Sequence, residues 1–193
     1  EEDAEDFGKQ VIPRAISQCR GCVNDYLFDG YWEDIGTIPA FFEANLNLTS
    51  PVPSFNFFDE EYPIWTHPRH LPASKLNACD AESIILGDGS IVDRSRIRRA
   101  VIGLRSMVRQ GCDLENVVMM GADFYETEEH RKRHQTQGQP PIGLGRNVSI
   151  RGAIIDKNAR IGDGVTIDHD PARPDRDGPD YWSRDGIVIV PRG

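Results

Sequence analysis

The feature that most constrains the fold is a regular spacing of aliphatic residues between residues 80 and 167. Aliphatic side chains recur in steps of 6, 6 and 5 residues, twice in succession, and after a break the rhythm resumes with steps of 6, 5, 6 and 6. The positions are Ile85, Ile91, Ile97, Ile102, Val108, Leu114 and Met119, then Leu144, Ile150, Ile155, Ile161 and Ile167. An amphipathic helix repeats about every 3.6 residues and a half-buried strand about every 2, so neither accounts for this pattern.

A spacing of about six residues is typical of a triangular coil, in which each short strand forms one face and one aliphatic side chain per face fills the axis. We predict that nine of these side chains lie nearly fully buried on one shared axis: Ile85, Ile91, Ile97, Ile102, Val108, Leu114, Ile150, Ile155 and Ile161. Corners are expected at glycines, which adopt positive φ at little cost: Gly87, Gly89, Gly111, Gly152, Gly162 and Gly164. The alternative is that chance aliphatic residues in a β-rich chain imitate the repeat.

Two segments interrupt the repeat. Residues 121–143 contain a polar stretch, ETEEHRKRH, which is predicted to be helical. Residues 168–185 are rich in Asp, Pro and Gly, which favours an exposed or partly disordered loop. Gly186–Val190 is predicted to form one more strand.

Residues 1–50 resemble a fragment of an α/β domain in their pattern. We predict a helix near Asp6–Ile16, a strand at Cys22–Phe28 and a second helix from about Ile38 to Leu48, with Thr37 as its N-cap. One strand and two helices cannot close a sheet, so this part is expected to need partners from outside the chain.

Residues 51–79 are predicted to be an extended linker. Repeated prolines prevent regular helix there, and the aromatic side chains are expected to pack the linker against a neighbouring surface. Residues 80–193 then form the repeat domain.

Charge and cysteine content exclude several classes of protein. A net charge of −9 and a pI of about 5.0 argue against a nucleic-acid binder. No apolar run approaches the roughly 20 residues of a membrane helix, and the acidic start argues against a signal peptide. Cys19 and Cys22 form a CxxC motif without the further ligands of a zinc site, so we expect structural thiols in a reducing compartment.

The sequence YWEDIGT at residues 31–37 is the strongest candidate for a site. Two aromatic and two acidic residues lie at an expected strand-to-helix junction, where α/β sheets bind their ligands. The carboxylates of Glu33 and Asp34 suit a sugar hydroxyl or a divalent metal that bridges phosphates. On these residues alone the alternative stays open that Asp34 only lies favourably before a helix N-terminus.

This heptapeptide belongs to a longer stretch, GYWEDIGTIPAFFEANL. Together with PRHLPASK, VIGLRSMVRQGCDLENVVMMGADFYET, PIGLGRNVSIRGAIIDKNARIGDGV and DGIVIV, it closely resembles the C-terminal part of ADP-glucose pyrophosphorylases. The plant and algal type fits best, and the small, catalytic type of subunit better than the large. The resemblance implies a mainly β fold, in which a left-handed parallel β-helix of hexapeptide repeats over residues 80–193 follows a partial α/β nucleotidyltransferase segment at residues 1–50.

The resemblance also implies an activity and a setting. The family makes ADP-glucose and pyrophosphate from ATP and glucose-1-phosphate, for starch or glycogen biosynthesis. Its members form homo- or heterotetramers, respond to anionic effectors such as 3-phosphoglycerate and phosphate, and lie in the plastid stroma, or in the cytoplasm if bacterial. No nucleic acid or membrane partner is implied.

The resemblance assigns roles to particular residues. Asp34 matches one of two aspartates that bind the catalytic Mg²⁺, and Glu33 and Asp34 match positions near the glucose-phosphate pocket. The positions that match effector ligands are Arg69, its neighbour His67, Asp156, Lys157 and Arg192, which stands where the family usually has lysine. We expect Arg69, Lys157 and Arg192 to converge on one anion site, with Phe57, Phe58 and Trp65 holding the linker in place.

Several parts of the family pattern are expected outside this chain. The glycine-rich ATP loop, the first metal aspartate and the glucose-1-phosphate lysine would all precede Glu1, and a final β-helix turn would follow the GIVIV segment. We therefore expect no ADP-glucose synthesis by the isolated chain. A non-catalytic regulatory or assembly module is the alternative function. A hexapeptide-repeat acyltransferase is disfavoured, because no His base lies within residues 80–120 or 144–167.

Two charged groups leave alternatives open. Residues 91–110 hold six arginines (94, 96, 98, 99, 105 and 109) against one acid, Asp93. They form either a stripe that holds phosphates or carboxylates, or a solvated face balanced by acids of neighbouring coils or subunits. His130 and His134 have the spacing of metal ligands on a helix, but a polar surface helix explains them more simply.

Overall fold

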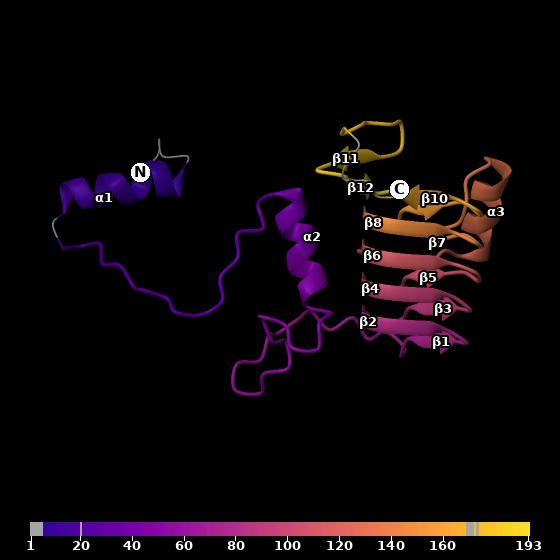
Figure 1. The fold of residues 1–193 in the computed structure, drawn as a ribbon, viewed down its shortest axis with the longest axis horizontal. Coiled ribbons are helices and arrows are strands. Elements are labelled where there is room, and N and C mark those ends of the chain that lie inside the picture. Colours follow the sequence, from indigo (N-terminus) through magenta and orange to yellow (C-terminus); the bar gives the residue numbers. More distant parts are fainter. Residues whose placement is uncertain (1–5, 20, 169–171, 173) are drawn as a thin grey trace. The chain divides into compact units, whose positions relative to one another are not determined.

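The computed structural model describes residues 6–19, 21–168, 172 and 174–193 (Figure 1). The chain divides into two units, Glu1–Trp32 and Glu33–Gly193. None of the helices described in either unit is long and apolar enough to cross a membrane.

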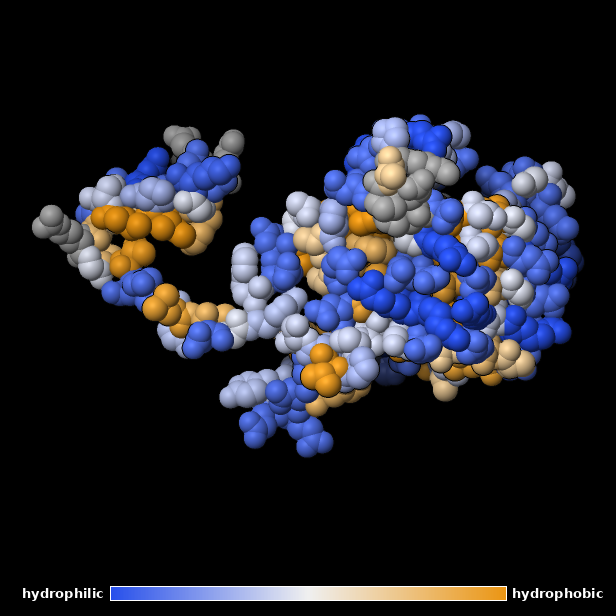
Figure 2. Space-filling model, viewed as in Figure 1, coloured by the Kyte–Doolittle hydropathy of each residue, from blue (hydrophilic) through white to orange (hydrophobic). Residues whose placement is uncertain are grey.

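The first unit contains a short π-helix, η1 (Phe7–Val11), and helix α1 (Ile12–Gln18). Neither helix has a buried residue, and Phe7 and Ile16 are more than half exposed. Figure 2 shows their apolar side chains on the surface of this unit. The predicted strand at Cys22–Phe28 is wrong, since residues 23–29 are extended but pair with no described strand. An isolated extended segment leaves its backbone hydrogen bonds to water, so it does not form a sheet on its own.

The two cysteines of the CxxC motif are joined. Cys19 and Cys22 form a disulfide, with their Cα atoms 5.5 Å apart. The expectation of free thiols was wrong here, because Gly21 adopts a φ of 86° and reverses the chain directly after α1. Cys79 and Cys112 are free, and Cys112 is buried in the second unit.

The second unit is built around a parallel β-helix. Its strands are β1 (Lys75–Asn77), β2 (Asp80–Leu86), β3 (Ile91–Asp93), β4 (Arg96–Ile102), β5 (Met107–Val108), β6 (Asp113–Met119), β7 (Gly143–Leu144), β8 (Ser149–Ile155), β9 (Arg160–Ile161), β10 (Thr166–Asp168), β11 (Trp182–Arg184) and β12 (Ile187–Val190). One sheet has the order β1-β3-β5-β7-β9, and the other runs β11-β12-β8-β6-β4-β2. All pairs between successive coils are parallel, so the chain advances by one strand spacing per coil (Figure 1).

The long strands bend to cover two faces of the triangle. A residue with positive φ lies in the middle of each one: Ser83, Arg99, Asn116 and Gly152. β10 pairs with the first half of β8 and β12 with its second half, so the two halves lead to different neighbours. The third face comes from β3, β5, β7 and β9.

Three stacked columns of aliphatic side chains fill the axis. Their members are Leu86, Ile102, Met119 and Ile155; Val92, Val108, Leu144 and Ile161; and Ile97, Leu114, Ile150 and Ile167. The repeat prediction is confirmed for seven of the nine named residues, which are at most 5% exposed. It was wrong for Ile85 and Ile91, since Leu86 and Val92 point inward in their place and Ile91 is 39% exposed.

The corners are less dependent on glycine than predicted. Gly89, Gly111, Gly152 and Gly164 have positive φ, but Gly87 and Gly162 do not. At Gly87 the constraint is close approach, because an added Cβ would lie 2.8 Å from the backbone nitrogen of Leu104 on the next coil. Most remaining corners use polar residues in the left-handed region, and asparagine, which tolerates it, recurs there.

Helix α2 (Ile38–Asn47) covers the outer surface of the long strands. The Thr37 hydroxyl accepts a hydrogen bond from the Ala40 N–H at 3.3 Å, which confirms the predicted N-cap. Phe42 and Leu46 are buried against three outward-facing side chains, Val118, Ile154 and Ile187. Glu43 adds an ion pair with Arg99 of β4 at 2.7 Å.

Residues 51–74 have no regular structure, as predicted, but β1 (Lys75–Asn77) lies within the predicted linker of residues 51–79 and belongs to the coil, because it pairs with β3. The aromatic side chains of the linker do not anchor it, however: Phe58 and Trp65 are each 90% exposed and Phe57 is 46% exposed. Phe57 instead packs edge-on against Phe55 at 5.3 Å between ring centroids. The expectation that these rings hold the linker against the coil was therefore wrong.

Both predicted interruptions of the coil are present. The insertion at residues 121–143 contains helix α3 (Glu128–Thr136), capped by Thr127. The second interruption, predicted as a loop over residues 168–185, contains strand β11, which pairs antiparallel with β12, and Arg184 bonds Asp177 at 2.6 Å. Residues 169–171 and 173 of this range lie outside the described residues. The predicted strand at Gly186–Val190 is confirmed as β12.

Glu126 fastens the α3 insertion to the coil. Its side chain is only 5% exposed, and it accepts hydrogen bonds from the Ile142 N–H at 2.8 Å and from Arg160 of β9 at 2.7 Å. His134 of α3 lies 3.1 Å from the same carboxylate. Burial raises the pKa of Glu126, but these hydrogen bonds outweigh it and hold the pKa below its usual value.

Glu126→Gln should destabilise the chain by about 1–3 kcal/mol at neutral pH, because it removes the charge from a buried hydrogen-bonded carboxylate. A depressed pKa stabilises the fold above the pKa of the unfolded chain and loses this effect as the pH falls through the acid range. The difference in urea midpoint between variant and native chain should therefore shrink on acidification. A difference that stays constant down to acid pH would contradict this assignment.

Candidate anion-binding corner and metal-ligand segment

One corner of the β-helix gathers two of the predicted effector residues. Asn158 lies at this corner with a φ of 59° and reaches back across one coil to Asp123. Its amide donates to the Asp123 carboxylate at 3.0 Å, and its side-chain oxygen accepts from the Asp123 N–H at 2.9 Å. These paired bonds fix Asp123 beneath the turn that carries Lys157.

Two cations converge on the Asp123 carboxylate. Lys157 Nζ lies 3.4 Å from Oδ1, and Arg192 Nη2 lies 2.7 Å from Oδ2. All three side chains remain open to solvent, with 46%, 61% and 36% of the Lys157, Arg192 and Asp123 side chains exposed. Lys157 and Arg192, which lie 35 residues apart in the chain, thus share one partner, Asp123.

Asp156 is part of the same turn but plays a different part. Its carboxylate accepts a hydrogen bond from the Lys157 backbone N–H at 2.6 Å. It therefore orients the backbone of Lys157 and leaves the Lys157 ammonium to Asp123.

The Asp123 carboxylate is strongly favoured in its ionised form. The hydrogen bond from Asn158 lowers the pKa of Asp123 most, burial opposes it, and the hydrogen bond and charge of Lys157 and the charge of Arg192 lower the pKa further. The corner thus holds two positive and two negative side chains, and its net charge is zero.

Arg69 and His67 do not reach this corner. Both are exposed, and neither side chain has a hydrogen bond or ion pair with any described residue. The carbonyl of Pro72, three residues after Arg69, accepts a hydrogen bond from the Gly89 N–H of the next coil. Equivalent backbone bonds between successive coils are donated by Arg105, Ala122 and Asn158. Four coil spacings of about 4.8 Å put roughly 19 Å between Pro72 and Asn158. The expected meeting of Arg69 with Lys157 is wrong within this chain, because the linker runs along the first coil.

Glu33 and Asp34 lie in an exposed, extended stretch just before α2. The Asp34 carboxylate accepts a hydrogen bond from the Gly36 N–H at 2.9 Å, which forms a turn ahead of the helix. Carboxylate oxygen is the donor that Mg²⁺ prefers, and this ion is commonly held by one or two carboxylates with phosphate oxygens and water. Asp34 fits such a position as a single ligand. Among the described residues no three His, Cys, Asp or Glu side chains group as a metal site, and this includes His130 and His134.

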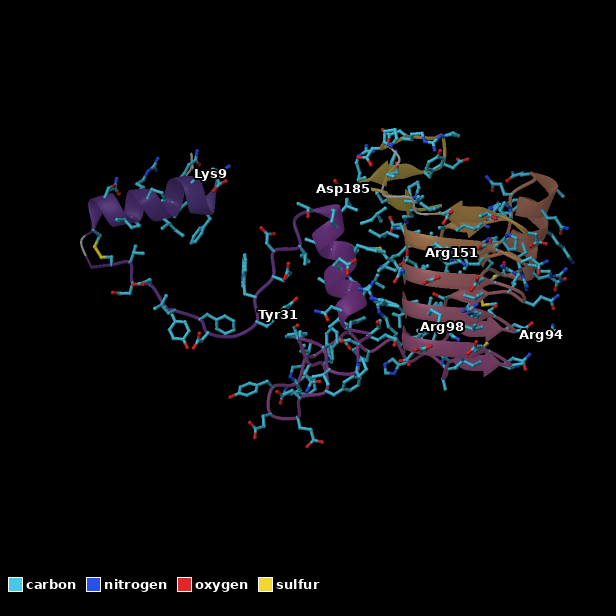
Figure 3. The ribbon with its side chains drawn as sticks, in the orientation of Figure 1. Lys9, Tyr31, Arg94, Arg98, Arg151 and Asp185 are labelled. Carbon is cyan, nitrogen blue, oxygen red and sulfur yellow. A yellow bond between two sulfur atoms is a disulfide. The ribbon has the colours of Figure 1, made fainter. Side chains whose placement is uncertain are left out.

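Five of the six arginines in the run bond other groups of the chain, and three of them, Arg94, Arg98 and Arg99, pair with acids. Arg98 forms a two-fold hydrogen bond with Asp80 and an ion pair with Glu82 of the coil below. Arg151 of β8 faces Asp113 and Glu115 of β6 in the same way (Figure 3). Of the other arginines in the run, four bond acids, amides or carbonyls (94, 99, 105 and 109). The solvated, balanced face is therefore the better description of this run.

Sequence reasoning missed Asp123 and Asn158. The signal that would have found them is coil register, since Asp123 follows the inward Met119 by four residues and Asn158 follows the inward Ile155 by three, on adjacent coils. The insertion at residues 121–143 lies between them and interrupts that register in the sequence.

Comparisons with known proteins agree with this architecture. Residues 69–193 match the family described as the GLGC left-handed parallel beta-helix domain, and residues 1–51 match the nucleotidyl transferase family. The small subunit of the chloroplastic/amyloplastic glucose-1-phosphate adenylyltransferase of wheat (Triticum aestivum) is 47% identical over 192 residues. That alignment covers 97% of this chain and 40% of the wheat protein.

Proposed function

This chain belongs to the ADP-glucose pyrophosphorylase (glucose-1-phosphate adenylyltransferase) family, and we propose that it supplies the β-helix and the adjoining metal-ligand segment of such an enzyme. The observation that carries this proposal is the likeness to the wheat small subunit, which spans nearly the whole chain. The chain covers 40% of that relative, so the remaining catalytic groups would come from the rest of a complete enzyme.

The proposed reaction is ATP plus glucose-1-phosphate to ADP-glucose plus pyrophosphate. A phosphate oxygen of the sugar phosphate attacks the α-phosphorus of ATP, and the bond to the leaving pyrophosphate breaks. Bound Mg²⁺ would neutralise phosphate charge during this exchange. In this chain Asp34 would donate one carboxylate ligand, and the turn to Gly36 would aim that carboxylate. Glu33 would lie beside the sugar-phosphate pocket.

We also propose that the Lys157–Arg192 corner binds an anionic effector such as 3-phosphoglycerate or phosphate. Two exposed cations from different coils converge there on a single acidic group. Arg192 offers a planar fork that matches two phosphate oxygens, and Lys157 adds a point charge. Arg69 and His67 would join the ligand only if contributed by another subunit.

Lys157→Ala in a complete enzyme should raise the effector concentration needed for activation about tenfold, because one charge-assisted hydrogen bond at an exposed site is lost. The unactivated rate should be nearly unchanged. Titrating the activation of both enzymes with 3-phosphoglycerate measures this. Arg184→Ala is a matched control, since it removes a paired surface cation from the β11 hairpin. Identical activation curves for native enzyme and the Lys157 variant would defeat the effector assignment.

A second candidate is a non-catalytic assembly module. It is favoured by the exposed apolar side chains of residues 6–32, which have no core of their own among the described residues and would suit a protein partner. A plastid location, which the name of the wheat relative gives for that protein, and tetramer formation, which the family resemblance implies, are part of the proposal. Adding this chain to a separately produced nucleotidyltransferase region and assaying ADP-glucose distinguishes the two, since an assembly module would not restore turnover.

A further inference from the structure

The Asp123 carboxylate occupies the place where an anion would bind. Oδ1 faces Lys157 and Oδ2 faces Arg192, so a single internal group already satisfies both cations. Two hydrogen bonds with Asn158 hold the backbone and the carboxylate of Asp123 in this position. The Asp123 carboxylate therefore occupies the position between the two cations that a bound anion would take.

We propose that Asp123 is a built-in competitor that sets the anion concentration at which the Lys157–Arg192 corner fills. This inference rests on the proposed anion-binding function of the corner. Binding would require Lys157 and Arg192 to turn from Asp123 to the incoming ligand. Both side chains are about half exposed or more, so they have room to move without disturbing the coil.

The charge balance supports displacement over simple addition. With Asp123 and Asp156 present, the corner is neutral and exerts little long-range attraction on an anion. The lowered pKa of Asp123 keeps its carboxylate charged through the neutral range. Without that charge the corner would carry a net charge of +1 and two cations with unsatisfied donors.

The competitor also restricts the class of ligand. A monocarboxylate such as acetate would only repeat the contacts that Asp123 already makes, and it would have to meet the entropic cost of association as well. A phosphate group carries more charge and three or more acceptor oxygens, so it can serve both cations at once and more strongly. The corner should therefore bind phosphate-bearing anions and show no measurable affinity for simple carboxylates.

Asp123→Asn tests the inference on the whole chain. Asparagine keeps the shape of the side chain and its contact with Asn158, while it removes the competing charge. Inorganic phosphate binding, measured by calorimetry at fixed ionic strength, should become about three- to tenfold tighter, because two exposed ion pairs no longer compete and each is worth up to a factor of about five. Acetate should give no measurable binding to the native chain in the same range. Asp113→Asn removes an equal charge from the outer strand surface and should leave phosphate affinity within about twofold of native.

The outcomes separate this inference from the proposed function. If Lys157→Ala abolishes phosphate binding but Asp123→Asn leaves it unchanged or weaker, Asp123 orients the cations for the ligand and the competitor role is overturned. If Lys157→Ala has no effect on phosphate binding, the corner itself is not the anion site. If neither the native chain nor Asp123→Asn binds phosphate, both fail. Tighter binding in Asp123→Asn alone, lost again in the double variant with Lys157→Ala, supports the competitor.

Discussion

Asp34→Asn in a complete enzyme should lower turnover by about a hundred- to a thousandfold while substrate binding weakens far less. A ligand carboxylate compensates charge chiefly where charge develops, in the transition state, so its loss is felt in kcat more than in KM. Several kcal/mol of stabilisation by a metal centre correspond to this range of rates. Steady-state kinetics with ATP and glucose-1-phosphate measure both constants.

The asparagine variant isolates the charge of Asp34 from its local contact. Its side-chain oxygen can still accept the Gly36 N–H, so the turn ahead of α2 should persist. Asp29→Asn removes the same charge from an exposed site five residues earlier and should leave turnover intact. An unchanged kcat in Asp34→Asn would contradict the assignment of Asp34 as a metal ligand and leave it only as a turn residue before the helix.

The sequence predicted the coil, but the predicted register of the first coil was wrong by one residue. From Ile102 to Met119 one turn takes 17 residues, whereas Leu86 to Ile102 takes 16. Extending the 6, 6, 5 spacing backwards therefore reached Ile85 and Ile91, one residue short of Leu86 and Val92. Because neighbouring strand residues face opposite sides, a slip of one residue exchanges the axis for the outer surface. Ile85 has indeed joined the outward column with Val101 and Val118.

The sequence predicted the two cations of the corner, Lys157 and Arg192, but not the acidic residue with which they pair, Asp123. Lys157 and Arg192 were named from the family resemblance of their own local sequence, and the structure brings both side chains to Asp123. Asp123 lies 34 residues before Lys157, across an insertion whose length no local rule predicts. Arg69 failed for a related reason, since its position depends on where an unpaired linker runs, and exposed rings such as Trp65 do not fix that path.

Helix α2 connects the segment that carries Asp34 with the β-helix, two regions that the sequence analysis assigned to different domains. Asp34 lies four residues before α2, whose Phe42 and Leu46 are buried on β6, β8 and β12. The side chains beneath them, Val118 and Ile154, flank axial positions on the same strands. A change in how the coils stack would therefore reach the stretch that carries Asp34 through a packed apolar contact.

Leu114→Ala should destabilise the second unit by about 2–5 kcal/mol, the largest loss of stability expected for any variant considered. Leu114 is fully buried between Ile97 and Ile150, so truncation removes its apolar contacts and leaves a cavity that flanking coils cannot fill. Leu76→Ala is a matched control, because Leu76 is in strand β1 but 49% exposed, and its loss should be under about 1 kcal/mol. Urea unfolding followed by circular dichroism compares the two. Equal midpoints for both variants would mean that Leu114 does not fill the axis, because a coil stabilised along one continuous core must respond most strongly to a gap in its middle.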